Sequence, residues 1–262
     1  MPPKKALVVA LSGCSSSGKT TLARLLRDIF PSTFILHEDD FYRPEAELPI
    51  KHGLVDWDCP ESIDIPAMAD ALSYIRENAS FPPTLDSKED QNSVGPSPIP
   101  PSLTSTLRQK VLSSLPPSHP LLLSTSTSDN KEPATTLKIC ILDGFLLYTP
   151  AMSSIQPHLD LKIFLRASYA KAKARREARD GYVTLEGFWA DPPGYVDKIV
   201  WPNYVESHAW LFEDGDVEGK FKKDVLEREG IRVPEGEPLD GDMEATLTWI
   251  VDLLLEELKK YA

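Results

Sequence analysis

Residues Gly13 to Thr20 read Gly-Cys-Ser-Ser-Ser-Gly-Lys-Thr and match the phosphate-binding pattern G-x-x-x-x-G-K-[ST] in full. Two glycines at this spacing let the backbone turn successive amides toward one point, where they can hold a phosphate. The lysine brings a mobile positive charge to the β- and γ-phosphates, and the threonine hydroxyl can coordinate Mg²⁺. The predicted nucleotide-binding residues of this loop are Gly13, Cys14, Ser15, Ser16, Ser17, Gly18, Lys19, Thr20 and Thr21.

A second predicted metal ligand is Asp143, which ends the apolar run at residues 137–142 and precedes Gly144. In nucleotide-binding proteins with such a loop, an acid at a strand end orients Mg²⁺ beside the phosphates. An Asp before a Gly is also an ordinary turn residue. Together with the phosphate loop, the position favours a metal site made by Thr20 and Asp143.

The loop predicts a bound nucleotide, but GTPases, ATPases, motors and kinases all share it, so the acceptor needs a separate argument. A kinase needs a group that accepts the proton of the attacking hydroxyl. Asp39 and Asp40 follow a second predicted strand, residues 34–36, whose end would open onto the same crevice as the loop. One of these two carboxylates could be that base. A solvated acidic turn is the alternative.

Further segments repeat, in chain order, the motifs of a known family. They are residues 37–45 (HEDDFYRPE), 52–58 (HGLVDWD), 142–148 (LDGFLLY), and 191–195 with 200–202 (DPPGY and VWP). With the phosphate loop they resemble the nicotinamide riboside kinases, P-loop nucleoside kinases similar to uridine kinases, over about residues 6–60 and 137–205. The resemblance implies ATP-dependent (or GTP-dependent) phosphorylation of the ribose 5′-hydroxyl of nicotinamide riboside, or also of nicotinic acid riboside. The product would be the mononucleotide, which feeds NAD biosynthesis.

The resemblance also implies roles for individual residues. Asp39 would be the general base, with Lys19 and Arg179 acting on the transferring phosphoryl group. Asp58 would accept the ribose 2′- and 3′-hydroxyls, and Trp57 would stack on the cationic pyridinium ring. Arg175 and Arg176 would bind the nucleotide, although a solvated basic helix face is the alternative for all three arginines. The substrate-binding residues implied are Asp39, Asp40, Trp57, Asp58, Asp191 and Tyr195.

Three features depart from the family pattern. The metal-site acid is Asp143, where the family leads us to expect Glu, so the shorter side chain would coordinate through water. The stretch from Arg179 to Asp191 is longer than expected and lies in a lid expected at about residues 175–200. Residues 79–136 have no counterpart in the compact members of the family.

Strands alternating with helices predict a three-layer α/β fold with a central parallel five-stranded sheet. Apolar runs mark strands at residues 6–12, 34–36, 137–142, 161–165 and 231–233. Helical spacing marks residues 20–30, 65–77, 169–179 and 243–260, the last with a stripe of Leu247, Ile250, Val251, Leu254 and Leu258. We expect one kinase domain, residues 1–262.

Residues 79–136 differ in composition from the rest of this domain. They hold ten of the chain's 24 prolines and many serines, which excludes regular sheet or a long helix through the whole stretch. We expect a largely disordered insertion in a surface connection. Leu103, Leu107, Val111 and Leu115 are spaced for one short amphipathic helix within it.

Net charge, the lengths of the apolar stretches and the cysteine count limit the classes of molecule that we expect the protein to bind. A net charge of −12 argues against sequence-independent binding of nucleic acid, which needs a basic face. No apolar stretch approaches the length of a membrane span, and the apolar run at residues 6–11 is too short for a secretion signal. Three widely spaced cysteines favour reduced thiols in the cytoplasm or nucleus. We expect small-molecule partners only, and a monomer.

Two other functions remain open on the residues alone. A uridine–cytidine kinase would share the phosphate loop and the fold, although Trp57 favours a cationic pyridine nucleoside. A regulatory protein could use the loop as a nucleotide switch and the Ser/Pro-rich insertion as its interaction segment. Against the second alternative, the sequence has no Thr-bearing switch loop and no guanine-reading N-K-x-D motif.

Overall fold

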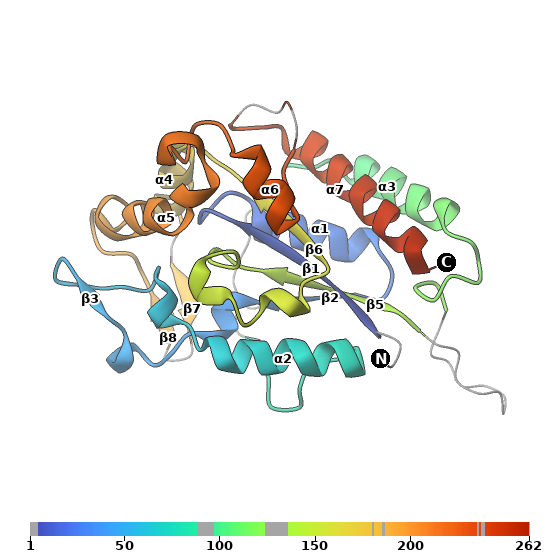
Figure 1. Cartoon of the computed structure of the whole chain (residues 1–262), viewed down its shortest axis with the longest axis horizontal. Coiled ribbons are helices and arrows are strands. Elements are labelled where there is room, and N and C mark those ends of the chain that lie inside the picture. The colour runs from blue at the N-terminus through green and yellow to red at the C-terminus, as the bar shows by residue number, and fades with distance from the viewer. Residues whose placement is uncertain are drawn as a thin grey trace.

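A parallel sheet forms the centre of the protein in the computed structural model, which describes residues 5–87, 97–123, 136–179, 181–184, 187–234, 236 and 239–261. Five strands follow the order β2-β5-β1-β6-β9, and all their pairings are parallel. They are β1 (Ala6–Gly13), β2 (Thr33–His37), β5 (Lys138–Asp143), β6 (Leu161–Leu165) and β9 (Ile231–Arg232). Helices cover both faces of this sheet (Figure 1). The predicted three-layer α/β fold is confirmed.

The central strand β1 is buried along its whole length. Its even-numbered residues 6, 8 and 10 belong to one hydrophobic core, and its odd-numbered residues 7, 9 and 11 belong to another. Successive side chains of a strand point to opposite faces, so a strand covered on both faces must be apolar at every position. This is why the run at residues 6–12 shows no polar alternation.

Three helices lie on one face of the sheet: α1 (Lys19–Ile29), α3 (Pro101–Ser114) and α7 (Met243–Leu258). Figure 1 shows α3 and α7 side by side, and both contact α1 or each other through buried side chains. The apolar stripe predicted for the last helix is confirmed, because Leu247, Ile250, Val251, Leu254 and Leu258 are all buried. This face is one of the two cores.

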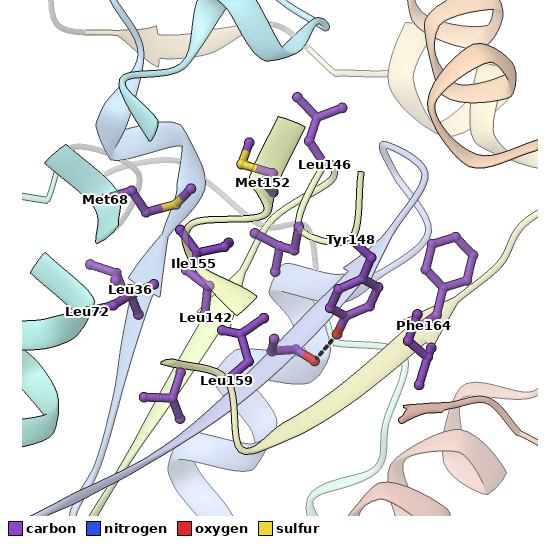
Figure 2. Close-up of a cluster of buried hydrophobic side chains, with 14 of the residues drawn as sticks. Leu36, Met68, Leu72, Leu142, Leu146, Tyr148, Met152, Ile155, Leu159 and Phe164 are labelled. Carbon is purple, nitrogen blue, oxygen red and sulfur yellow. Dashed lines mark hydrogen bonds between the residues drawn. The ribbon is translucent and has the colours of Figure 1, made fainter. Parts of the chain in front are cut away.

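The second core lies on the opposite face, against α2 (Ile65–Asn78) and the connection at residues 144–159. Figure 2 shows Met68 and Leu72 of α2 packed near Leu36 and Leu142, which come from neighbouring strands. The buried Tyr148 hydroxyl donates a hydrogen bond to the carbonyl of Ala10 at 2.8 Å. That bond ties the connection after β5 to the central strand.

The remaining elements lie outside the parallel sheet and the helices described above. They include two small antiparallel hairpins and three helices: β3 (Ile50–Lys51) with β4 (Leu54–Val55), β7 (Tyr182–Thr184) with β8 (Gly187–Trp189), α4 (Tyr169–Glu177), α5 (Trp201–His208) and α6 (Lys223–Glu229). Every helix in the described ranges is too short or too polar to span a lipid bilayer.

The amphipathic helix predicted inside the Ser/Pro-rich insertion is present as α3. Its Leu107 and Val111 are buried in the same core as α1 and α7, and Leu115 just beyond its end is buried too. The described part of the insertion, residues 79–87 and 97–123, therefore contributes to the core, which the expectation of a largely disordered segment did not include. Residues 88–96 and 124–135 lie outside the described residues.

Candidate active site

The phosphate loop turns sharply between β1 and α1. Gly13 has φ 144° and Gly18 has φ 102°, conformations that favour glycine. A Cβ on Gly13 would lie 2.1 Å from the carbonyl oxygen of Leu165, so the neighbouring strand also excludes a side chain there. Both glycines of the predicted motif are thus required by the backbone, and α1 begins directly after the second one.

Inside this loop, Lys19 is buried and its Nζ donates hydrogen bonds of 2.9 Å to the carbonyls of Gly13 and Cys14. Thr20, the next residue of α1, donates from its hydroxyl to an Asp143 carboxylate oxygen at 2.6 Å. Thr21 follows half-buried in the first turn. The structure therefore brings the predicted lysine, hydroxyl and strand-end acid together at one side of the loop.

The ends of β2 and β5 lie next to each other at this side, because His37 and Asp143 are paired in register. The His37 Nδ1 atom lies 3.4 Å from an Asp143 oxygen, and both side chains are buried. Burial alone would raise the pKa of Asp143, but His37, Lys19 and Thr20 together hold that pKa below its ordinary value. Asp143 is therefore ionised at neutral pH.

Asp39 is half-buried just beyond β2, in the short 3₁₀ helix at residues 38–41. Burial raises the pKa of Asp39 to about 6, and repulsion from Asp143, at the end of the neighbouring strand, adds to the rise. Asp40 is next to it and equally half-buried. A carboxylate with a pKa of about 6 is ionised at neutral pH and can accept a proton.

Between these acids and the core lies Glu38, which the sequence analysis did not single out. It is fully buried, and one carboxylate oxygen accepts hydrogen bonds from the amides of Phe145 at 2.5 Å and Leu146 at 3.1 Å. Burial raises the pKa of Glu38 to about 8. A Cβ on Gly144 would lie 2.6 Å from the same carboxyl, so that glycine makes room for it. Glu38, Asp39 and Asp40 are consecutive acids, and nothing in their order indicates which of the three side chains is buried.

A buried guanidinium, that of Arg176 on α4, joins the loop to two distant acids. It makes paired hydrogen bonds to Asp58 at 2.8 and 3.0 Å and to Asp191 at 2.6 and 3.2 Å. A further bond of 3.0 Å reaches the Ser15 hydroxyl in the phosphate loop. Despite this partner, burial raises the pKa of Asp58 above its ordinary value. Four residues predicted separately thus form one cluster.

The other two arginines of the prediction lie differently. Arg175 is exposed and donates from its guanidinium to the carbonyl of Ser16 at 3.2 Å, so it also contacts the phosphate loop. Arg179 follows the end of α4, and its side chain is exposed. Of the three, Arg176 is the one that the structure places between the loop and the candidate nucleoside residues.

An aromatic group lies beside this cluster. Trp57 is buried, with the ring of Tyr42 edge-on at 5.2 Å and the ring of Trp189 tilted at 5.5 Å between centroids. The Tyr195 hydroxyl accepts from the Trp57 amide and donates to the Val55 carbonyl, both at 3.0 Å. Tyr195 therefore holds the backbone of the 55–57 segment in place. Trp189 was not predicted, because an aromatic residue in a short hairpin carries no pattern of its own.

The segment that carries Asp58 is also fixed by Asn203 of α5, again unpredicted. Its amide donates to both carboxylate oxygens of Asp56 at 2.8 Å and to the Asp58 carbonyl at 3.2 Å. Asp56 in turn accepts from the Asp58 amide at 3.0 Å. These bonds set the direction of the Asp58 side chain through its backbone.

Oxygen donors at the ends of β2 and β5 fit a hard cation such as Mg²⁺, which keeps several waters and needs only one or two protein carboxylates plus substrate phosphates. Thr20 and Asp143 would hold it, with Asp39 close by. The part of the chain that the structure describes contains no group of three or more His, Cys, Asp or Glu side chains shaped as a self-sufficient metal site. The donor set therefore fits a cation that arrives with a nucleotide.

Known proteins similar to this chain cover most of its length, although no family model matches it. A nicotinamide riboside kinase from Schizosaccharomyces pombe is 38% identical over 221 residues, covering 83% of this chain and 86% of the relative. The Saccharomyces cerevisiae protein of the same name is 36% identical, covering 84% of each. That of Eremothecium gossypii is 31% identical over 254 residues, covering 96% of this chain and 92% of the relative.

The chain belongs to the nicotinamide riboside kinase family. The resemblance drawn from the dispersed motifs is thereby confirmed. The alignments with family members reach beyond the segments at residues 6–60 and 137–205 that carried the resemblance. The cluster around the phosphate loop is accordingly the candidate active site of a member of this kinase family.

Proposed function

We propose that this chain transfers the γ-phosphoryl group of ATP to the ribose 5′-hydroxyl of nicotinamide riboside, giving nicotinamide mononucleotide for NAD synthesis. The observation that carries the proposal is the meeting of Lys19, Asp143 and Asp39 at one side of the phosphate loop. A phosphoryl donor, a cation and a proton acceptor would all be needed at that place. Membership of the family supplies the acceptor.

In the proposed reaction the 5′-oxygen attacks the γ-phosphorus, and its proton passes to the Asp39 carboxylate. The bond between the γ-phosphorus and the bridging oxygen breaks, and ADP leaves with that electron pair. Lys19 would leave the carbonyls of Gly13 and Cys14 to contact the phosphates. Mg²⁺ held by Thr20 and Asp143 would neutralise charge on the phosphate oxygens. Positioning and electrostatics do most of this work.

The riboside would lie between Asp58 and the aromatic group. Asp58 would accept the 2′- and 3′-hydroxyls, sharing or replacing the hydrogen bonds that Arg176 now makes to it. Trp57 would offer a ring face to the pyridinium, which requires the Trp189 ring to shift from its present contact. Asp191, on the same side as Trp189, would lie toward the nicotinamide amide group.

This arrangement supports a lid made by residues of about 175–200 within a single kinase domain, residues 1–262. Arg176, Asp191 and Tyr195 all lie in that range, and each contacts residues of the 55–58 segment or a partner of that segment. We further propose a monomer in the cytoplasm or nucleus, since Cys14, Cys59 and Cys140 are buried free thiols.

The test is a transfer assay with purified protein, MgATP and nicotinamide riboside, in which the mononucleotide is separated and quantified. We expect nicotinamide riboside to be phosphorylated far faster than uridine at equal concentration. Nicotinic acid riboside and GTP in further arms decide acceptor and donor preference. Lys19→Ala should abolish transfer mainly through kcat. Preference for uridine would contradict the proposed acceptor, and tight ATP binding without any transfer would favour a regulatory protein.

A further inference from the structure

A cavity of about 360 Å³ lies beside the phosphate loop. The loop contributes Ser17 to its wall, and α4 contributes Lys171 and Arg175. Asp39, Asp58 and Asp143 do not line it. Its size lies in the range of pockets that hold small organic ligands.

The geometry of the proposed reaction indicates which part of ATP would lie in this cavity. A triphosphate on the loop with its γ-phosphate toward Asp39 and Asp143 has its α-phosphate, ribose and base at the opposite end. The cavity begins at that end, at Ser17. Its wall carries three cations, Arg166, Lys171 and Arg175, and two acids, Asp240 and Asp242, and Arg175 is the cation that also contacts the phosphate loop. The nucleoside part of ATP therefore belongs here, and this step rests on the proposed function.

One wall of the cavity comes from the Ser/Pro-rich insertion, through Pro98. Pro98 is exposed toward the opening, while the next residue, Ile99, is buried in the core shared with α1 and α7. The Ile99 amide donates to the Ser97 hydroxyl at 3.2 Å, and the Leu103 amide donates to the Pro100 carbonyl at 3.0 Å. This turn leads directly into α3.

The helix α3 holds the turn in place. Leu107 and Val111 are buried against α1 and α7. At its surface, Arg108 donates to the Asp28 carbonyl at the end of α1 at 2.6 Å, and Lys110 forms an ion pair with Asp252 of α7. Because α1 starts at the phosphate loop and α7 starts at the cavity wall, α3 fixes the turn relative to both.

We propose that residues 97–100 are a built wall of the site for the nucleoside part of ATP, anchored by α3, and that the insertion thereby sets the affinity for the phosphate donor. The proline ring presents an apolar surface to the base at a fixed backbone angle. It comes from a segment other than the phosphate loop and α4. Its contribution should accordingly depend on the nucleoside and not on the phosphates.

The experiment measures equilibrium binding by titration calorimetry, without riboside, for ATP and for inorganic triphosphate. Pro98→Gly should weaken ATP binding roughly three- to tenfold, as expected for the loss of one apolar wall contact in a pocket. Triphosphate binding should be unchanged. The matched control is Pro117→Gly, an exposed proline of the same insertion that lies outside the cavity wall, which should bind both as the wild type does.

Unchanged ATP binding by Pro98→Gly overturns the proposal, and so does an equal loss for ATP and triphosphate, which would indicate a distorted loop. If Pro98→Gly does not fold, Pro98→Ala is measured with the same expectations. The transfer assay separates the two claims. A wild type that binds ATP but does not phosphorylate the riboside contradicts the proposed function alone, whereas normal transfer with unaltered binding by the variant contradicts this inference alone.

Discussion

Asp39 is the residue on which the proposed chemistry depends most directly. Replacing it by Asn keeps its size but removes the proton acceptor, so we expect kcat to fall about 10²- to 10⁴-fold. The KM values for riboside and ATP should change little, because the acid acts during transfer. Steady-state kinetics of Asp39→Asn and Asp40→Asn side by side decide between the two neighbouring acids. A larger kcat effect for Asp40→Asn would make Asp40 the base.

In the proposed reaction Asp58 has a different task, because a carboxylate that holds the ribose would serve the ground state and the transition state alike. Asp58→Asn should raise the KM for the riboside, lower kcat less, and leave the KM for ATP near normal. We expect a penalty on the order of 2–3 kcal/mol, typical of a charged acceptor for paired hydroxyls. The measurement is kinetics with each substrate varied in turn. A change confined to the KM for ATP would contradict the proposed contact between Asp58 and the riboside.

The buried Glu38 carboxyl should make the free energy of unfolding depend on pH. Its pKa is raised by burial to about 8, so between pH 4.5 and 8 the folded state keeps a proton that the unfolded chain releases. Stability therefore falls as pH rises through this window. Glu38→Gln removes the ionisation and can still accept from the Phe145 and Leu146 amides.

The variant should accordingly be more stable than the wild type at pH 8.5, by on the order of 4 kcal/mol. At pH 5 the two proteins should differ much less. Urea unfolding at the two pH values measures both differences. An equal difference at both would mean that the carboxyl keeps the same charge when the protein folds.

At the scale of elements, the contribution of α3 to the stability of the fold can be tested with two neighbouring substitutions. Val111 has no exposed surface, whereas the next residue, Leu112, is 45% exposed. Val111→Asp buries a charge in the core and should cost about 3–5 kcal/mol or prevent folding, while Leu112→Asp should stay within about 0.5 kcal/mol. Thermal melts of the two variants give the answer. Equal, small effects would mean that α3 contributes little to the core.

How far the elements could be predicted depended on their length. The strands β1, β5 and β6 and the helix α7 were predicted correctly because each is long enough to show a continuous apolar run or an apolar stripe. The hairpins β3–β4 and β7–β8 have two or three residues per strand, too few for a pattern. The helix α3 was predicted from its leucine and valine spacing, but its burial was not, since its partners α1 and α7 are distant in sequence.

The same limit applies to the site. The phosphate loop is contiguous, so its lysine, threonine and glycines could be found from one segment, and the structure brings them to Asp143 as expected. The cluster around Arg176 joins residues 15, 58, 176 and 191. Which of three nearby arginines turns inward depends on the rotation of α4 against the loop, and the sequence does not contain that angle.

For the whole molecule, the central strand predicts how the protein unfolds. Since β1 sends alternate side chains into two cores, neither core can open without exposing the strand that the other needs. We expect one cooperative transition. Far-ultraviolet circular dichroism and tryptophan fluorescence should give the same midpoint in urea, because Trp201 and Trp210 pack against one core and Trp249 of α7 packs against the other. Two separated midpoints would show that the cores unfold independently.

The hydrogen bonds of Arg176 bear on the hydrolysis of ATP by water when no acceptor is bound. Asp58 and Asp191 hold both edges of the Arg176 guanidinium, which also donates to the Ser15 hydroxyl of the phosphate loop, so two carboxylates already balance its positive charge. A water molecule has no vicinal hydroxyls with which to compete for Asp58, whereas the ribose of the acceptor does. In the proposed reaction, the acid that recognises the acceptor would thus also hold back this cation until the acceptor arrives, and hydrolysis of the nucleotide by water would lack the charge that productive transfer gains.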